Sequence, residues 1–194
     1  MLREKYLNRL IEAKDTEFIK VITGVRRSGK SSLLVMFKEY LINDGIDSKN
    51  IIHINFESAM YDDIKNYKDL YNYIKSLLSK GRNYILLDEV QNVVEWEKAV
   101  NSMNIDFDTD IYITGSIAYL LSSELATLLS GRYVEIKMYP LSFKEFLYFN
   151  NYDRNNIEDK FNEYLKYGGL PAITHIKYEK VKEKELRILE STPL

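Results

Sequence analysis

Short apolar runs alternate with longer amphipathic segments along most of the chain. The apolar runs are rich in β-branched residues, and most end in a glycine, an acid or a hydroxyl residue, which is typical of buried strands. The runs that predict strands are 18–24, 50–57, 82–90, 110–116 and 132–139. Elsewhere apolar residues recur at three- and four-residue intervals, which predicts helices. These helical segments are 2–14, 30–43, 62–81, 95–104 and 118–131.

The alternation of strands and helices predicts an α/β fold. Helices that connect parallel strands cover both faces of the sheet, so the expected architecture is a three-layer sandwich. In such folds ligands bind at the carboxyl ends of the strands. We therefore expect the functional residues to lie where the predicted strands end.

The pattern changes after residue 141. Ser142 and Glu145 have the spacing of a capping box, which predicts the start of a helix. The remaining elements expected from the sequence are a helix, a turn and a charged helix, at 161–168, 168–171 and 178–190. We interpret residues 1–141 as the core domain and residues 142–194 as a small helical lid.

Composition narrows the class of protein. The chain has 194 residues, of which 45% are hydrophobic and 29% are charged, and this is enough to build one soluble domain. A net charge of -2 gives no overall positive potential that would attract nucleic acid or an anionic membrane. The absence of cysteine and the wide separation of His53 and His175 argue against disulfides and a zinc site. No long apolar run predicts a signal peptide or a membrane span, so we expect a cytoplasmic protein.

The segment GVRRSGKS, residues 24–31, matches the full phosphate-binding loop pattern between a predicted strand and a predicted helix. Its glycines allow the backbone N–H groups to point inward at phosphates, and the helix N-terminus adds positive potential. Lys30 supplies a charge to the β- and γ-phosphates, and the Ser31 hydroxyl is a ligand for Mg²⁺. The residues predicted to bind ATP are Gly24, Val25, Arg26, Arg27, Ser28, Gly29, Lys30, Ser31 and Ser32. The alternatives are a chance glycine-rich turn and, for Arg26 and Arg27, simple solvation.

Two acids follow the apolar run of the third predicted strand. Asp88 and Glu89 are out of pattern for a buried strand, and they are the residue types that Mg²⁺ and ATP require. Asp88 is predicted to hold the metal, commonly through water. Glu89 is predicted to orient and deprotonate the attacking water as the general base. The alternative is a solvated boundary between strand and loop.

Three further residues are candidates for the same reaction. Thr114 ends the fourth predicted strand, where its hydroxyl can sense the γ-phosphate or position water; the alternative is a turn that caps the next helix. Asn55, at the end of the second strand, is a candidate to hold Glu89 inactive, or is an ordinary turn residue. Arg132 precedes the fifth strand and is a candidate to reach the γ-phosphate on a neighbouring copy; the alternative is a surface arginine.

With these residues identified, the chain resembles the predicted ATPases of the AAA+ superfamily in bacteria and archaea, which are related to archaeal and STAND-type NTPases. The matching segments run through most of the chain: GVRRSGKSSLL, INFE, YILLDEVQNVVEW, YITGS, LLSGRYVEI, YPLSFKEFL and YLKYGGLPA. The DEVQ segment followed by Trp96, and the pairing of SGRYVEI with PLSFKEF, are more specific than the phosphate loop alone. The resemblance implies a P-loop NTPase sheet of order 5-1-4-3-2 with a helical lid after the fifth strand.

The resemblance also implies roles and partners. It implies that Gly24, Gly29, Lys30 and Ser31 bind phosphate and Mg²⁺, and that Asp88 and Glu89 bind the metal and the attacking water. Arg132 matches the conspicuous arginine of the family pattern. It places the turn from Gly169 to Pro171 near the nucleotide. Ile117 is a departure, because the family often has asparagine there. Family members are about twice as long, so we expect a further C-terminal domain beyond the ATPase part. The candidate role of Arg132 requires a homo-oligomer, and the sequence leaves the oligomeric state open.

The sequence leaves several functions open. The leading hypothesis is an ATP-hydrolysing switch or motor with low turnover until a partner completes the site. The others are a scaffold that binds ATP without hydrolysing it and an ATPase associated with nucleic acid. A kinase would share the phosphate loop, but the pair of acids favours water as the nucleophile.

Overall fold

A computed structural model describes residues 3–116, 127, 129, 131–152, 156–174, 182 and 186 of the chain. Two expected helices, at 118–131 and 178–190, lie almost entirely outside these residues, as does Ile117. No helix in the described part of the chain is both long enough and apolar enough to cross a bilayer.

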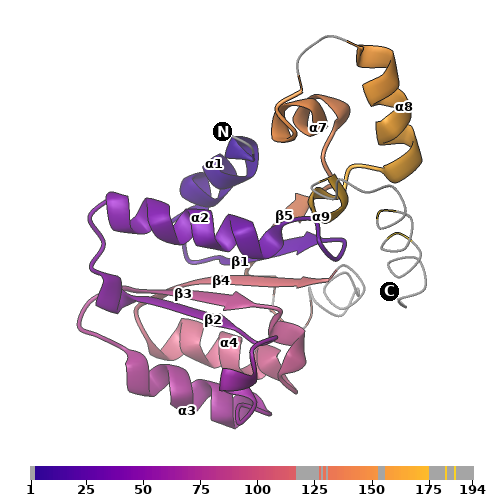
Figure 1. Ribbon diagram of the computed structural model, residues 1–194. Coiled ribbons are helices and arrows are strands. Elements are labelled where there is room, and N and C mark those ends of the chain that lie inside the picture. The colour runs from indigo at the N-terminus through magenta and orange to yellow at the C-terminus, as the bar shows by residue number, and fades with distance from the viewer. Residues whose placement is uncertain are drawn as a thin grey trace.

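A five-stranded sheet with parallel pairing forms the middle layer (Figure 1). Its strands are β1 (Ile19–Gly24), β2 (Ile51–Asn55), β3 (Asn83–Asp88), β4 (Thr109–Ser116) and β5 (Tyr133–Met138). Their order in space is β2-β3-β4-β1-β5, which confirms the predicted order of 5-1-4-3-2. The phosphate-loop strand β1 therefore lies between β4 and β5, and all strands end at the same edge.

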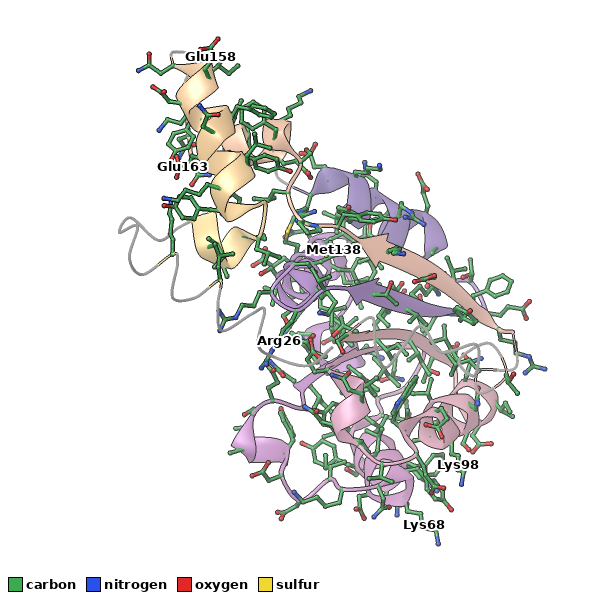
Figure 2. All side chains as sticks on the ribbon, turned by 90° about the vertical axis from the view of Figure 1, so that its right-hand side faces the viewer. Arg26, Lys68, Lys98, Met138, Glu158 and Glu163 are labelled. Carbon is green, nitrogen blue, oxygen red and sulfur yellow. The ribbon has the colours of Figure 1, made fainter. Side chains whose placement is uncertain are left out.

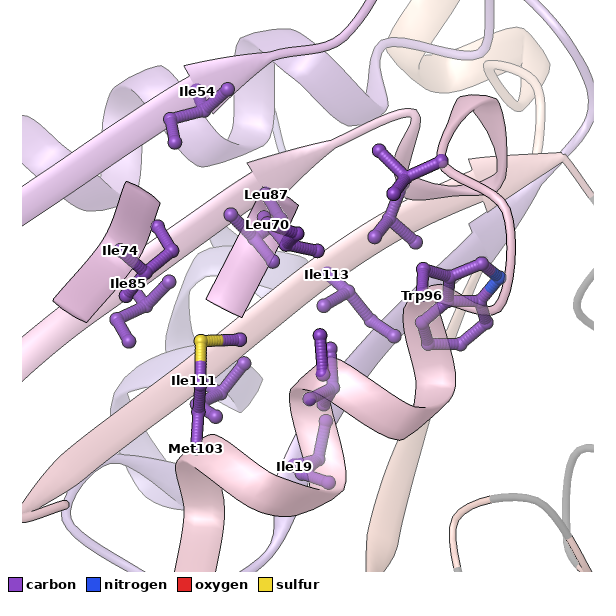
Figure 3. Close-up of a cluster of buried hydrophobic side chains, with 14 of the residues drawn as sticks. Ile19, Ile54, Leu70, Ile74, Ile85, Leu87, Trp96, Met103, Ile111 and Ile113 are labelled. Carbon is purple, nitrogen blue, oxygen red and sulfur yellow. The ribbon is translucent and has the colours of Figure 1, made fainter. Parts of the chain in front are cut away.

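Two pairs of helices cover the two faces of the sheet. Helices α1 (Glu4–Ala13) and α2 (Lys30–Asn43) lie on one face, and α3 (Tyr67–Leu77) and α4 (Trp96–Asp106) lie on the other (Figure 1). Figure 3 shows the larger apolar cluster, in which side chains of β1, β2, β3 and β4 pack against α3 and α4. A second cluster joins α1 and α2 to the opposite face. The predicted three-layer sandwich is confirmed.

The helix expected at 62–81 is shorter than its pattern indicates. It begins at Tyr67 because the Asn66 side chain accepts the N–H groups of Lys68 and Asp69, while the Asp69 carboxylate accepts the Asn66 N–H. It ends at Leu77, before Gly81. The Asn83 side chain binds the backbone of Ser79 and of Gly81, which holds this connection in a turn.

Three short 3₁₀ helices were not expected from the sequence. They lie in the connections before β2, after β2 and after β3: Ser48–Asn50, Ala59–Tyr61 and Val90–Asn92. In the first two, an Asp or Ser side chain accepts a backbone N–H group two residues on. Such local turns follow from side-chain hydrogen bonds and carry no apolar period.

A group of small helices follows β5: α7 (Phe143–Phe149), α8 (Ile157–Tyr167) and α9 (Pro171–Thr174). The expected capping box is present, because the Ser142 hydroxyl accepts the Glu145 N–H and Glu145 Oε2 accepts the Ser142 N–H. Gly169 packs so closely on the Leu141 carbonyl that a Cβ would come within 2.1 Å of its oxygen. The expected turn at 168–171 is therefore tied to the β5–α7 connection, and α9 begins at its last residue.

A buried polar network lies at the opposite end of the sheet from these helices. Lys20 Nζ and Asp110 Oδ1 are 2.5 Å apart, and both side chains are fully buried. Asp110 Oδ2 also accepts the Tyr112 hydroxyl at 2.9 Å and the Asp15 N–H at 2.8 Å. Burial lowers the pKa of Lys20 from its ordinary value, and the Asp110 carboxylate opposes that shift.

Candidate functional site

The loop after β1 turns tightly at the carboxyl edge of the sheet. A Cβ on Gly24 would lie 2.6 Å from the Met138 carbonyl oxygen, so only glycine fits between β1 and β5. The Ser28 N–H donates to the Val25 carbonyl, and Arg27 has a φ of 64°, which turns the chain back toward α2. Helix α2 then begins at Lys30, so its N-terminus faces this edge.

Lys30 is held inside the loop. Its side chain is 3% exposed, and Nζ lies 3.3 Å from the Gly24 carbonyl oxygen and 3.4 Å from that of Val25. Nζ is also 3.4 Å from Oε1 of Glu89, whose side chain is 14% exposed. The ammonium group and the predicted base therefore meet at the point where β1 and β3 end.

Thr114 orients the two acids at the end of β3. Its hydroxyl is completely buried, donates to Asp88 Oδ1 and accepts the Glu89 N–H at 3.0 Å. Glu89 adopts a φ of 53°, in the left-handed region. This backbone turn moves Glu89 out of the strand direction, so Asp88 stays buried while Glu89 faces Lys30.

The partner of Glu89 that sequence reasoning missed is Gln91. Gln91 Nε2 donates to Glu89 Oε2 at 2.6 Å, whereas Asn55 Oδ1 accepts the N–H of Glu57 at 2.8 Å. The candidate contact between Asn55 and Glu89 is therefore replaced by one from the 3₁₀ helix after β3. The available signal was in the DEVQ segment, where Gln91 stands two residues after Glu89.

A pocket of about 530 Å³ opens beside the loop, and α9 and the end of α7 form its other wall. Its lining residues are Arg26, Arg27, Gly29, Lys30, Ser31, Ser32, Glu57, Glu89, Phe149, Pro171 and Ala172. Arg26 and Glu57 form an exposed ion pair of 3.6 Å at its mouth. Figure 2 shows Arg26 between helix α8, which carries Glu158 and Glu163, and the layer that carries Lys68 and Lys98.

The pocket matches the needs of a triphosphate and a hard divalent cation. The helix N-terminus, Lys30 and two arginines supply positive potential, and Ser28 Oγ is a buried hydroxyl without a hydrogen-bond partner in the described structure. The Ser31 hydroxyl and the Asp88 carboxylate are oxygen ligands of the kind that Mg²⁺ prefers. The pocket thus brings together most of the predicted residues.

Arg132 lies far from this pocket in its own chain. Its carbonyl accepts the N–H of Ile19 at 2.9 Å, so it stands at the start of β5, beside the start of β1. The phosphate loop follows the other end of β1. The Arg132 side chain is exposed, and its placement is compatible with contact to a second molecule but not with contact to its own loop.

A family model described as an AAA domain matches residues 16–147 of the chain. An uncharacterized protein of Haemophilus influenzae is 55% identical over 175 residues, which cover 88% of this chain and 44% of that protein. The chain spans less than half the length of each curated relative that it matches here.

Two solved structures share the fold at low sequence identity. The Walker-type ATPase of Pyrococcus abyssi has a TM-score of 0.58 and 18% identity, covering 89% of this chain and 65% of its own. DnaA of Aquifex aeolicus, solved with AMPPCP, has a TM-score of 0.54 and 15% identity, covering 100% of this chain and 62% of its own. These likenesses concern the architecture of the domain.

Proposed function

The chain belongs to the family of AAA domains, and we propose that it binds ATP with Mg²⁺ and hydrolyses it as a switch or motor for a partner. The observation that carries the proposal is the meeting of Lys30 and Glu89, 3.4 Å apart, in a pocket lined by the N-terminal residues of α2. One group suits phosphate and the other suits water, so their proximity fits hydrolysis better than binding alone.

Each residue of the site has a separate proposed task. Lys30 exchanges its contacts with Glu89 and two loop carbonyls for the β- and γ-phosphates. Ser31 and Asp88 would hold Mg²⁺, which would neutralise phosphate charge. Glu89 then accepts a proton from the attacking water while Gln91 keeps its carboxylate oriented. Thr114, which bonds Asp88 and Glu89, keeps the two acids in register.

The contact between Lys30 and Glu89 supports slow turnover by the isolated domain. In the present arrangement the ammonium group neutralises the carboxylate that would act as the base, and the loop carbonyls hold the ammonium group in turn. Both groups must be released before hydrolysis. A partner that favours the released arrangement would raise the rate without contributing a catalytic group.

Replacing Lys30 by alanine tests binding. We expect Lys30→Ala to weaken Mg–ATP binding by roughly 2–4 kcal/mol, the scale of a lost charge-assisted contact in a buried site. Titration with a fluorescent ATP analogue measures the change. Lys38→Ala removes the same charge from the same helix, away from the pocket, and should leave affinity near the parental value. Equal affinity of Lys30→Ala and the parent would remove the loop from the proposal.

A mixing experiment tests whether Arg132 acts between copies. Because Arg132 is at the opposite end of β5 from its own loop, we expect hydrolysis per subunit to rise with protein concentration. Mixing Arg132→Ala with Lys30→Ala should recover part of the activity, since one copy retains the nucleotide site and the other the arginine. An inactive mixture, together with a specific rate independent of concentration, would leave Arg132 as a surface residue.

A further inference from the structure

Arg3, at the start of α1, contacts three parts of the molecule that are distant in sequence. Nη2 donates to the Ser28 carbonyl of the phosphate loop at 3.3 Å, and Nη1 donates to the Tyr139 carbonyl after β5 at 2.8 Å. Nη1 also lies 3.8 Å from Oε1 of Glu145 on α7. The guanidinium stacks over the Tyr6 ring at 5.2 Å from its centre. Figure 1 shows the N-terminal end of α1 beside α7.

Arg3 is largely buried, which is unusual for an arginine side chain. Its side chain is 8% exposed, so the guanidinium has exchanged water for these protein partners. A planar guanidinium can serve several acceptors at fixed angles, which a lysine cannot reproduce. Here its acceptors belong to the loop, to the end of the sheet and to the lid.

We propose that Arg3 is a positioning residue that couples the helical lid to the phosphate loop. The N–H group at Nη2 donates to the Ser28 carbonyl, so Arg3 holds that carbonyl toward α1 and fixes this part of the loop. Glu145 fixes the same guanidinium from the lid side. A shift of α7 therefore moves Arg3, and Arg3 moves the carbonyl of Ser28. The consequence for nucleotide affinity rests on the proposed function, whereas the mechanical coupling does not.

The coupling can be tested at Glu145 without removing the helix cap, because its two carboxylate oxygens have different partners. Oε2 accepts the Ser142 N–H and hydroxyl in the capping box, while Oε1 faces Arg3. Glutamine also serves as the third residue of a capping box. Glu145→Gln therefore keeps the start of α7 and removes the charge that faces Arg3.

The decisive measurement is amide hydrogen exchange of the nucleotide-free protein, in residues 24–29 and in α7. Arg3→Met should speed exchange in both segments about tenfold, because a hydrogen bond from a charged donor is lost at the loop. Glu145→Gln should speed exchange of the loop about two- to fivefold, the scale of a partly exposed ion pair. In an Arg3→Met background, Glu145→Gln should add nothing at the loop. In the part of the chain that the structure describes, the Glu145 carboxylate contacts Arg3 and Ser142 and not the loop, so the effect must pass through Arg3.

Arg9→Met is the matched control. Arg9 lies on the same helix and donates to the Glu135 carbonyl of β5 at 3.2 Å, so its loss should leave exchange of the loop and of α7 unchanged. Parental loop exchange in both Glu145→Gln and Arg3→Met would overturn the coupling. If Arg3→Met does not fold, the exchange rate of the loop in Glu145→Gln tests the coupling by itself, and a parental rate there would overturn it.

Binding of a fluorescent ATP analogue separates this inference from the proposed function. If Arg3 couples the lid to the loop, Arg3→Met should bind the analogue roughly tenfold more weakly than the parent, and Arg9→Met should bind it as the parent does. A purely structural Arg3 would lower the melting temperature and leave both affinity and loop exchange of the folded protein intact, which would contradict the proposal. A parent that binds no analogue would remove the nucleotide function, and loop exchange would still decide the coupling.

Discussion

Replacement of Glu89 by glutamine is expected to lower ATP turnover by about 10²–10⁴-fold while ATP still binds. Glutamine keeps the shape and length of the side chain, so it can remain beside Gln91, but it cannot take a proton from water. The contact with Lys30 loses its charge at the same time, so the ammonium group is freer to meet phosphate. Phosphate release at saturating ATP measures turnover, and titration of a fluorescent analogue measures binding.

Glu57 provides the matched control for this variant. Glu57 lines the same pocket and carries the same charge, but it pairs with Arg26 at the exposed mouth. Glu57→Gln should therefore hydrolyse ATP at close to the parental rate. If Glu89→Gln also does so, Glu89 is not the base, and a scaffold that uses ATP as a structural ligand becomes the better description.

Replacement of Asp110 by alanine is expected to lower the free energy of unfolding by about 3–5 kcal/mol, because it strands a buried charge. Lys20 would lose its carboxylate partner in an environment with no exposure, and the Tyr112 hydroxyl and the Asp15 N–H would lose their shared acceptor. Urea unfolding gives the free energy, and an unchanged slope would show that the unfolded state is the same.

Two further variants locate this effect in the ion pair. Tyr112→Phe removes only the hydroxyl and should cost about 1 kcal/mol. Adding Lys20→Met to Asp110→Ala should recover part of the loss, because the stranded charge is gone. A double variant less stable than Asp110→Ala would contradict the assignment. The network is remote from the pocket, so folded Asp110→Ala should bind nucleotide as the parent does.

The sheet was predictable because its central strands are buried throughout. Every residue of β1 and of β3 is buried and most of these residues are apolar, so each strand stands out from its surroundings in the sequence. The spatial order of the strands came from the family resemblance and not from periodicity. The boundaries of α3 were wrong because side chains of Asn66 and Asn83, rather than apolar spacing, decide where that helix begins and ends.

The candidate site was predictable where its residues are adjacent in sequence. The loop and the pair of acids are local motifs, and the structure brings the loop and Glu89 into one pocket, with Asp88 buried directly behind Glu89 in the chain. Gln91 was missed because a glutamine after two acids has no fixed role until the left-handed turn at Glu89 brings the two side chains together. Arg3 could not be found from the sequence, because its acceptors lie 25 and 136 residues away.

The left-handed backbone at Glu89 limits how this position can evolve. Glycine, asparagine and aspartate tolerate such a φ best. None of them, however, has a carboxylate on a side chain long enough to contact Lys30 and Gln91 as Glu89 does. β-branched residues would be strained by the backbone alone. The residues that fit this backbone best therefore lose the carboxylate contacts of Glu89. A longer acid keeps those contacts and must tolerate the backbone strain. A variant library would find that abundance and activity select different residues at this position.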